Sequence, residues 1–389
     1  MQRRSFIKTL AVGTTSITSG CAAIQSAVKP GHWILYVGSY TGEKSKGIEA
    51  FRFDAASGAM DPLGLAAEVK NPSFLAIHPN GNYLYAVNET NDWGGKKVGA
   101  VTAFRIDHST SKLTRLNEMS SGGDGPCHLV VDHSGRCVLV ANYGGGSVAS
   151  FKLASDGSLE STASFHQHRG PVHLPQRQGS PHGHSINVSP DNRFAFAADL
   201  GLDQILVYRL DAATGELTPH QPPYTKVPPG SGPRHFTFHS GGKFAYVINE
   251  ITCTVTTFSY QPKLGILTEL QTVSTLPEGV AVHPSYSTAE IVAHPTGRFI
   301  YGSNRGHDTI AVFKVGKDGR LTLVENVSTQ GKTPRNFAID PTGTFLLAEN
   351  QSSDSVVAFR IHQGTGRLTA TGRVINVGSP VCIRFVKAR

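Results

Sequence analysis

The stretch SGPRHFTFHSGGKFAYVINE, residues 231–250, decides the fold, because its design recurs along the chain. Each copy has an alternating apolar run, a turn such as His-Pro-x-Gly, and a second apolar run that ends in Asn or Asp. A third run such as SVVAFRI (355–361), a glycine-containing turn and a weaker fourth run complete the unit. Short alternating runs between turn residues are typical of antiparallel β-strands, so each unit predicts a four-stranded sheet.

The unit recurs about every 46–57 residues, a period typical of the blades of a β-propeller. First strands are expected to begin near Pro72, Pro126, Gly183, Pro233, Thr288, Pro334 and Pro380. Because the chain ends soon after the seventh start, the three missing strands must come from residues 34–40, 47–54 and the run after ASGAM (56–60). We therefore predict an all-β fold, a seven-bladed β-propeller of four-stranded antiparallel blades. Its last blade is closed by strands from both termini, and one domain spans residues 33–389.

The N-terminal segment MQRRSFIKTLAVGTTSITSGCAAIQSA (1–27) has the pattern of an export signal. A twin arginine precedes a weakly apolar stretch and an alanine-rich exit, which resembles a bacterial twin-arginine leader. Cleavage after Ala23 or Ala27 and lipid anchoring at Cys21 both remain open, and the apolar stretch is too short to span a membrane. We expect a protein exported to the periplasm through the twin-arginine pathway.

The composition narrows the classes of partner. Apolar residues make up 39% of the chain and charged residues 16%, as in globular proteins. The formal net charge is +8, but no basic run or basic stripe interleaved with aromatic residues is present, which argues against nucleic-acid binding. A small anionic substrate fits this balance. We expect a monomer without a cofactor. The four cysteines beyond Cys21 form no CxxC pair and are expected to be buried free thiols.

The repeat also predicts a site, because the start of each first strand and the end of each second strand meet at one mouth of the central channel. Asn or Asp recurs at the second-strand end in six copies, which indicates a structural cap. The neighbouring positions differ between copies and carry ionisable residues: His184, Arg234, His235, Glu250, Glu290, Arg305 and Arg335. Such a set predicts an anion-binding or catalytic site. The alternative is a set of ion pairs that fix the blades, Glu250 with Arg305 and Glu290 with Arg335.

The segment HQHRGPVHLPQRQGSPHGHS (166–185) is longer than its counterparts and contains five histidines. Its spacing matches no metal-binding motif, so no metal site is predicted. We expect a loop over the channel mouth that adds Arg177, Gln178 and His182 to the pocket.

Over residues 33–386 the sequence resembles the family of seven-bladed β-propeller lactonases, which includes bacterial 6-phosphogluconolactonases and fungal carboxymuconate cyclases. The segments that carry the resemblance are YVGSYT (36–41), GIEAFRFD (47–54), RQGSPHGHSINVSPD (177–191), DLGLDQILVYRLD (199–211), GPRHFTFH (232–239), VINE (247–250), GSNRGHDTIAVF (302–313) and PRNFAIDPTG (334–343). The resemblance implies that His184, Arg234, Glu250 and Arg305 are catalytic. It leaves Arg177, Gln178, His182, His235, Glu290 and Arg335 as substrate-binding candidates.

The resemblance implies a lactonase acting on a sugar-acid lactone, gluconolactone or its 6-phosphate. Hydrolysis would need a general base, Glu250 or His184, and arginines that stabilise the oxyanion. A serine nucleophile is not expected, since the Gly-x-Ser-x-Gly motif is missing from the sequence. Two alternatives stay open: a carboxymuconate-type lactonizing cyclase, and a propeller that binds a ligand without catalysis.

Overall fold

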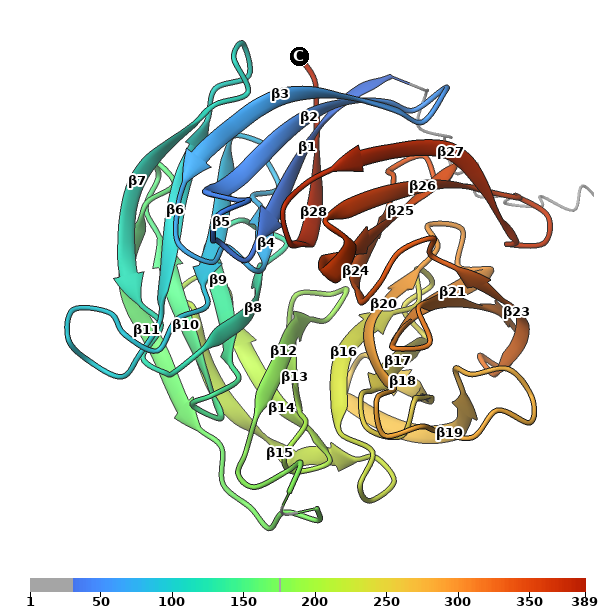
Figure 1. Ribbon diagram of the computed structural model, residues 1–389. Coiled ribbons are helices and arrows are strands. Elements are labelled where there is room, and N and C mark those ends of the chain that lie inside the picture. Colours follow the sequence, from blue (N-terminus) through green and yellow to red (C-terminus); the bar gives the residue numbers. More distant parts are fainter. Residues whose placement is uncertain (1–30, 175) are drawn as a thin grey trace, which may run out of the picture.

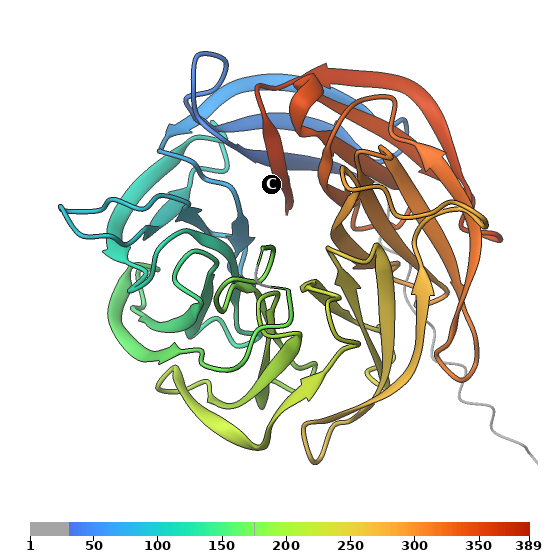
Figure 2. The ribbon, with the colours of Figure 1, turned by 60° about the horizontal axis from the view of Figure 1, so that its bottom comes forward.

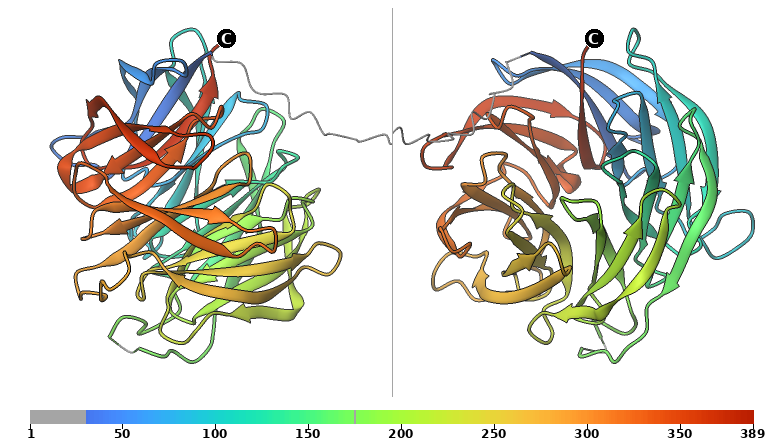
Figure 3. Two further views of the ribbon diagram at one scale, coloured as in Figure 1. Left: turned by 90° about the vertical axis from the view of Figure 1, so that its right-hand side faces the viewer. Right: turned by 180° about the vertical axis from the view of Figure 1, so that it is seen from behind.

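The computed structural model describes residues 31–174 and 176–389, so the predicted leader lies outside the described residues. Within this part of the chain the strands form seven four-stranded antiparallel sheets. The sheets are arranged in a ring about a common axis (Figure 1), which Figure 2 shows from a tilted direction and Figure 3 from the side and from behind. The predicted seven-bladed propeller is confirmed.

Each blade contributes strands from the axis outward. The innermost strands are β4 (Leu75–Ile77), β8 (Pro126–Val131), β12 (Gly183–Val188), β16 (Pro233–Phe238), β20 (Ser287–Ala293), β24 (Pro334–Ile339) and β28 (Pro380–Lys387). The second strands are β5 (Tyr83–Asn88), β9 (Cys137–Asn142), β13 (Phe194–Asp199), β17 (Phe244–Asn249), β21 (Phe299–Arg305), β25 (Phe345–Asn350) and β1 (His32–Ser39). The third strands are β6 (Ala100–Ile106), β10 (Ser147–Leu153), β14 (Gln204–Asp211), β18 (Thr254–Gln261), β22 (Thr309–Val315), β26 (Ser355–Ile361) and β2 (Gly47–Asp54). The outer strands are β7 (Leu113–Ser120), β11 (Leu159–Gln167), β15 (Glu216–Lys226), β19 (Ile266–Ser274), β23 (Leu321–Ser328), β27 (Leu368–Asn376) and β3 (Ala59–Glu68).

The last blade joins the two ends of the chain, as predicted. Its strand order is β28-β1-β2-β3, with β28 antiparallel to β1 from Trp33↔Lys387 to Ser39↔Pro380. Figure 1 shows the red β28 beside the blue β1. This pairing closes the ring through backbone hydrogen bonds, so the inner edge of this blade is made by the other end of the chain.

The inner strands carry β-bulges at the end where they begin. The register shifts between Pro126 and His128, between Gly183 and Ser185, between Pro233 and His235, and between Pro334 and Asn336. A bulge leaves one residue out of the ladder and re-aims its side chain. The residues released in this way are Cys127, His184, Arg234 and Arg335, all of which lie at the same mouth of the channel.

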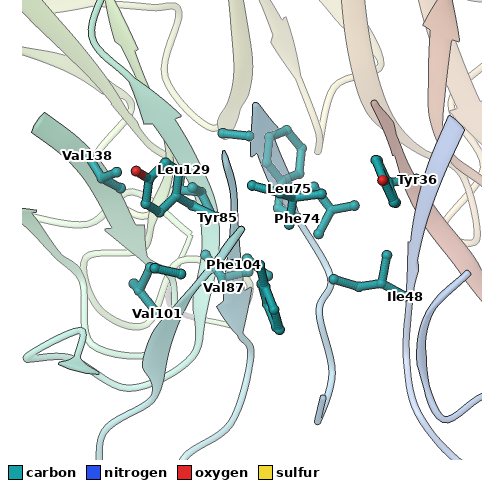
Figure 4. Close-up of a cluster of buried hydrophobic side chains, with 14 of the residues drawn as sticks. Tyr36, Ile48, Phe74, Leu75, Tyr85, Val87, Val101, Phe104, Leu129 and Val138 are labelled. Atoms are coloured by element: carbon teal, nitrogen blue, oxygen red, sulfur yellow. The ribbon is translucent and has the colours of Figure 1, made fainter. Parts of the chain in front are cut away.

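Apolar residues of neighbouring blades pack against each other between the sheets. Figure 4 shows one such cluster, in which Tyr36, Leu75, Tyr85 and Leu129 come from three blades. The buried tyrosine hydroxyls are also used, since Tyr85 donates to the backbone carbonyl of Gly157 at 2.9 Å. Blade contacts are therefore both apolar and hydrogen-bonded, which makes the ring a rigid support for side chains at its mouth.

None of the helices among the described residues has the length and apolarity needed to cross a bilayer. All four cysteines of this part of the chain are free and buried, as expected.

Candidate active site

The mouth of the channel is lined by bulged residues and by the residues that end the second strands. The recurring Asn or Asp at those ends is buried and structural, as the repeat predicts. Asn249, for example, donates to the hydroxyls of Thr254 and Thr256, both at 2.9 Å. The next residue along the chain, Glu250, is turned toward the bulged residues instead.

Glu250 is the centre of the site. Its Oε2 lies 2.9 Å from Arg234 Nε, 2.9 Å from an Arg305 Nη2 and 3.9 Å from His184 Nε2. Its Oε1 lies 3.5 Å from Arg177 Nη2. Four of the predicted site residues therefore converge on one carboxylate, from β16, β21, β12 and the long loop.

The charges of this cluster are set by burial and by each other. Burial raises the pKa of Glu250, but Arg305 and Arg234 outweigh it, so the pKa is lowered and the carboxylate is ionised at neutral pH. Burial and the neighbouring Arg305 and Arg335 lower the pKa of Arg234 to about 10, which leaves it cationic. Arg234 is only 2% exposed and also donates to the carbonyl of Ala289 at 2.7 Å.

His184 is a neutral imidazole at this site. Burial, followed by the charge of Arg234, lowers its pKa well below 6.5. Its Nδ1 lies 3.6 Å from the sulfur of Cys127, and its ring packs edge-on against Tyr143 at 5.1 Å between centroids. Burial raises the pKa of the Cys127 thiol, so this cysteine is not a thiolate nucleophile. The neutral ring of His184 can therefore accept a proton at Nε2, and this nitrogen lies beside the ionised carboxylate of Glu250.

Arg335 lies on the other side of the mouth, over the ring of Tyr40 at 5.4 Å. The hydroxyl of Tyr40 donates to Glu89 at 2.8 Å, and the hydroxyl of Ser73 also donates to Glu89. Among the described residues, Arg335 has no carboxylate within ion-pair distance. Its guanidinium is therefore available to an anion that enters the mouth.

The long loop between β11 and β12 places its predicted residues in different roles. Arg177 is 48% exposed and reaches Glu250, so it lies on the rim. His182 stacks on Tyr143 at 4.5 Å between centroids and bonds to its backbone carbonyl. Gln178 is fully buried instead and donates to Leu200 O and Asp203 Oδ1, each at 2.8 Å, so it anchors the loop.

His235 and Glu290 lie one layer below the mouth. His235 Nδ1 and Glu290 Oε1 are 2.9 Å apart, and Asn336 also donates to Glu290. Glu290 therefore pairs with His235 rather than with Arg335, the partner that the ion-pair alternative assigned to it. The other proposed pair, Glu250 with Arg305, is present.

The family model "Lactonase, 7-bladed beta-propeller" matches residues 34–385. The chain belongs to the seven-bladed β-propeller lactonase family.

Two curated relatives and one solved structure of named activity are similar to the chain over most of its length. A 6-phosphogluconolactonase of Bacillus subtilis is 38% identical over 358 residues, which cover 91% of this chain and 98% of the relative. A 6-phosphogluconolactonase of Formosa agariphila is 36% identical, over 79% of this chain and 86% of the relative. The structure of a periplasmic gluconolactonase from Pseudomonas aeruginosa superposes with a TM-score of 0.85 at 35% identity, covering 92% of this chain and 100% of that one.

The histidines of the long segment in this lactonase-family protein are dispersed. His168 Nδ1 bonds to Asp199 at 2.6 Å, His166 Nε2 bonds to the carbonyl of Leu217 at 2.7 Å, and His182 turns to Tyr143. Across the described ranges, no group of three or more potential ligand side chains is gathered as a metal site requires.

Sequence reasoning missed several residues of the lactonase-family mouth. Glu89, Tyr143, Cys127 and Ser73 occupy the same repeat positions as Glu250 and Arg234, so the repeat contained the signal. Tyr40 could not be found in that way, because the composite blade ends without the turn from which the positions are counted.

Proposed function

We propose that the protein hydrolyses a sugar-acid lactone at this mouth, with His184 as general base, Glu250 as its charged partner and the arginines as oxyanion and anion binders. The observation that carries the proposal is the ionised Glu250 between two arginines, 3.9 Å from the Nε2 of a neutral histidine. The names of the lactonase relatives support the same reaction class.

The reaction begins with a water that gives its proton to His184 Nε2 as its oxygen attacks the lactone carbonyl carbon. The imidazolium that forms is stabilised by the negative charge of Glu250, whose Oε2 lies 3.9 Å from the same Nε2. The ring C–O bond then breaks, and the imidazolium returns the proton to the leaving alkoxide. One water is consumed, and the product is the open hydroxy acid.

The negative charge that develops on the carbonyl oxygen needs donors close by. We assign this role to Arg305 and Arg234. Arg305 is the more exposed of the two, with 14% of its side chain accessible against 2%, so it is the one more open to substrate. Because both guanidiniums are fixed by Glu250, they require little reorganisation as the oxyanion forms.

Arg335 and Arg177 supply charge for a carboxylate or phosphate on the substrate. At this mouth four arginines (177, 234, 305 and 335) face two glutamates (89 and 250), a formal balance of +2. The balance favours an anionic lactone over a neutral one, and the 6-phosphate of gluconolactone fits it better than gluconolactone itself.

The proposal is tested by acid release in a pH-stat with 6-phosphogluconolactone, δ-gluconolactone and a muconolactone. Glu250→Gln and His184→Ala are expected to lower the rate about 10²–10⁴-fold. Arg320→Gln is the matched control, since Arg320 forms an exposed pair with Asp318 in a turn at the opposite face. Full activity in both site variants would overturn the assignment. Activity of the wild type with the muconolactone alone would favour the cyclase, and inactivity with all three would favour a ligand-binding propeller.

We further propose that the protein is exported, on the grounds of the twin-arginine leader and the periplasmic relative. Cell fractionation of the wild type and of an Arg3→Lys/Arg4→Lys variant tests this proposal. The wild type is expected in the periplasm or bound to the membrane by a lipid at Cys21, and the variant in the cytoplasm. Equal distribution of the two would contradict export through this leader.

A further inference from the structure

A second cavity lies on the axis below the catalytic mouth and opens at the opposite face. Its volume is about 470 Å³, within the range of small-molecule sites. His235 and Glu290 line the end of the cavity nearest the mouth. Val131, Ile339 and Phe385, near the last residues of their strands, line its other end. Because each inner strand runs away from the mouth, these last residues mark the far face of the ring.

Most of the side chains that line this cavity are aliphatic or aromatic, its polar members are His128, Asn187, His235 and Glu290, and its one cation is Arg384. Leu129, Ile291, Phe337 and other aliphatic and aromatic side chains line it, and Arg384 projects from β28 among them. The guanidinium of Arg384 lies over the ring of Phe74 at 4.5 Å and donates to the adjacent carbonyl of Ile383 at 2.6 Å. Among the described residues, no carboxylate lies within ion-pair distance of it.

The two carboxyl groups nearest Arg384, those of Glu290 and Glu349, both lie beyond ion-pair distance of its guanidinium. Burial raises the pKa of Glu290, which is already bonded to His235 and Asn336. Burial also raises the pKa of Glu349 well above 4.5, and neither of its oxygens has a hydrogen-bond partner in the described structure. Arg384 is therefore the one lysine or arginine among the residues that line the cavity, and no carboxylate of the described residues pairs with it.

We propose that this cavity is a second binding site, for a small monocarboxylate with an apolar body, whose carboxylate pairs with Arg384. A single guanidinium matches one carboxylate in a two-point hydrogen-bonded pair. The aliphatic and aromatic walls exclude water from the rest of the ligand, which strengthens that pair. The catalytic mouth differs in kind, since its arginines and glutamates suit a polyhydroxylated and more highly charged ligand. The proposal is independent of the proposed lactone hydrolysis.

The test is a titration of the folded protein with 4-fluorophenylacetate, followed by ¹⁹F NMR. Saturable binding is expected, with an affinity roughly 10- to 100-fold weaker in Arg384→Gln, the range for loss of a charged hydrogen bond. Arg360→Gln is the matched control, because Arg360 also stacks on a phenylalanine ring, at 4.6 Å, but is an exposed residue of β26 that does not line the cavity. Glu250→Gln is expected to leave the affinity unchanged, which separates this site from the mouth.

A second variant and a second probe keep the test decisive. Val292→Trp fills the cavity from a partly exposed position on β20 and is expected to abolish binding, even if Arg384→Gln does not fold. The neutral analogue 2-(4-fluorophenyl)ethanol is expected to bind at least tenfold more weakly than the acid. The proposal is overturned by an absence of saturable binding, by unchanged affinity in Val292→Trp, or by equal affinity for the two probes.

Discussion

A carboxylate as buried as that of Glu250 is costly unless cations surround it. Arg234 and Arg305 supply those cations, and they come from two different blades. The ion pair with Arg234 links the start of β16 to the end of β17 within one blade. The ion pair with Arg305 links this blade to the next one, at the end of β21. These two ion pairs offset the cost of burying Glu250 and also hold the guanidiniums of Arg234 and Arg305 in place. Folding stability and the proposed function therefore depend on the same atoms.

The lowered pKa of His184 leads to a prediction for the pH dependence of kcat/KM. In the proposed hydrolysis the neutral imidazole is the active form, and burial with the nearby Arg234 keeps it neutral below pH 6.5. As the pH falls through 6.5, activity is therefore expected to stay level and to decline only at lower pH, when the imidazole or the Glu250 carboxylate takes up a proton.

Initial rates from pH 8 to pH 4.5, corrected for spontaneous hydrolysis, test this pH dependence. An acid limb centred at or above pH 6.5 would contradict it, because such a limb indicates an unperturbed histidine.

At the scale of elements, the β-bulges at the start of the inner strands explain why the sequence predicted the site residues but not the two layers in which they lie. The repeat positions of His184, Arg234 and Glu250 could be counted from the turn glycines, and the fold, including its composite blade, followed from the same count. Counting from the turn glycines could not reveal that Arg234 is left out of the β16–β17 pairing while His235 is paired. A bulge depends on how the two strands pair, and the sequence repeat does not record that. The repeat consequently predicted one layer of charged residues where the structure has two.

Gln178 illustrates the same limit for the long loop. Its sequence neighbours Arg177 and His182 lie at the mouth, but its amide is buried against Leu200 and Asp203. Nothing in the loop sequence distinguishes a rim residue from an anchor, since the difference depends on which blade surface the loop covers.

The anchoring role of Gln178 predicts the effect of Gln178→Ala. Its three hydrogen bonds, including the one accepted from the backbone N–H of Leu174 at 2.9 Å, would be lost and would leave buried groups unsatisfied. The expected cost is about 1–3 kcal/mol of local stability. The KM for an anionic lactone is expected to rise several-fold with kcat nearly unchanged, because the loop no longer holds Arg177.

A double-mutant cycle with Arg177→Ala distinguishes this role from a direct contact of Gln178 with the substrate. The double variant is expected to have the KM of Arg177→Ala alone. Additive effects on KM would show that Gln178 acts independently of Arg177.

At the scale of the whole molecule, the ring depends on β28. Val381, Cys382, Ile383 and Val386 are almost completely buried in this strand. Burial of the three aliphatic side chains among them corresponds to about 4.5–9 kcal/mol. This is comparable with the roughly 5–15 kcal/mol that holds a typical domain folded.

Deletion of residues 380–389 is therefore expected to abolish the cooperative thermal transition seen by circular dichroism. Deletion of Ala388 and Arg389 alone serves as the control and is expected to lower the transition temperature only slightly. A truncated protein without β28 that still unfolds cooperatively near the wild-type temperature would contradict the closing role of this strand.

The pairing of β28 with β1 also determines where the chain enters and leaves the ring. The backbone N–H of Ala388 donates to the carbonyl of His32 at 3.2 Å, so the two ends of the propeller are neighbours. Both lie at the face opposite Glu250, since β1 runs toward the mouth and β28 runs away from it. A tag joined directly to either end of the propeller, before β1 or after β28, would therefore tether the protein to a bead or electrode with the face that carries Glu250 directed toward the solution.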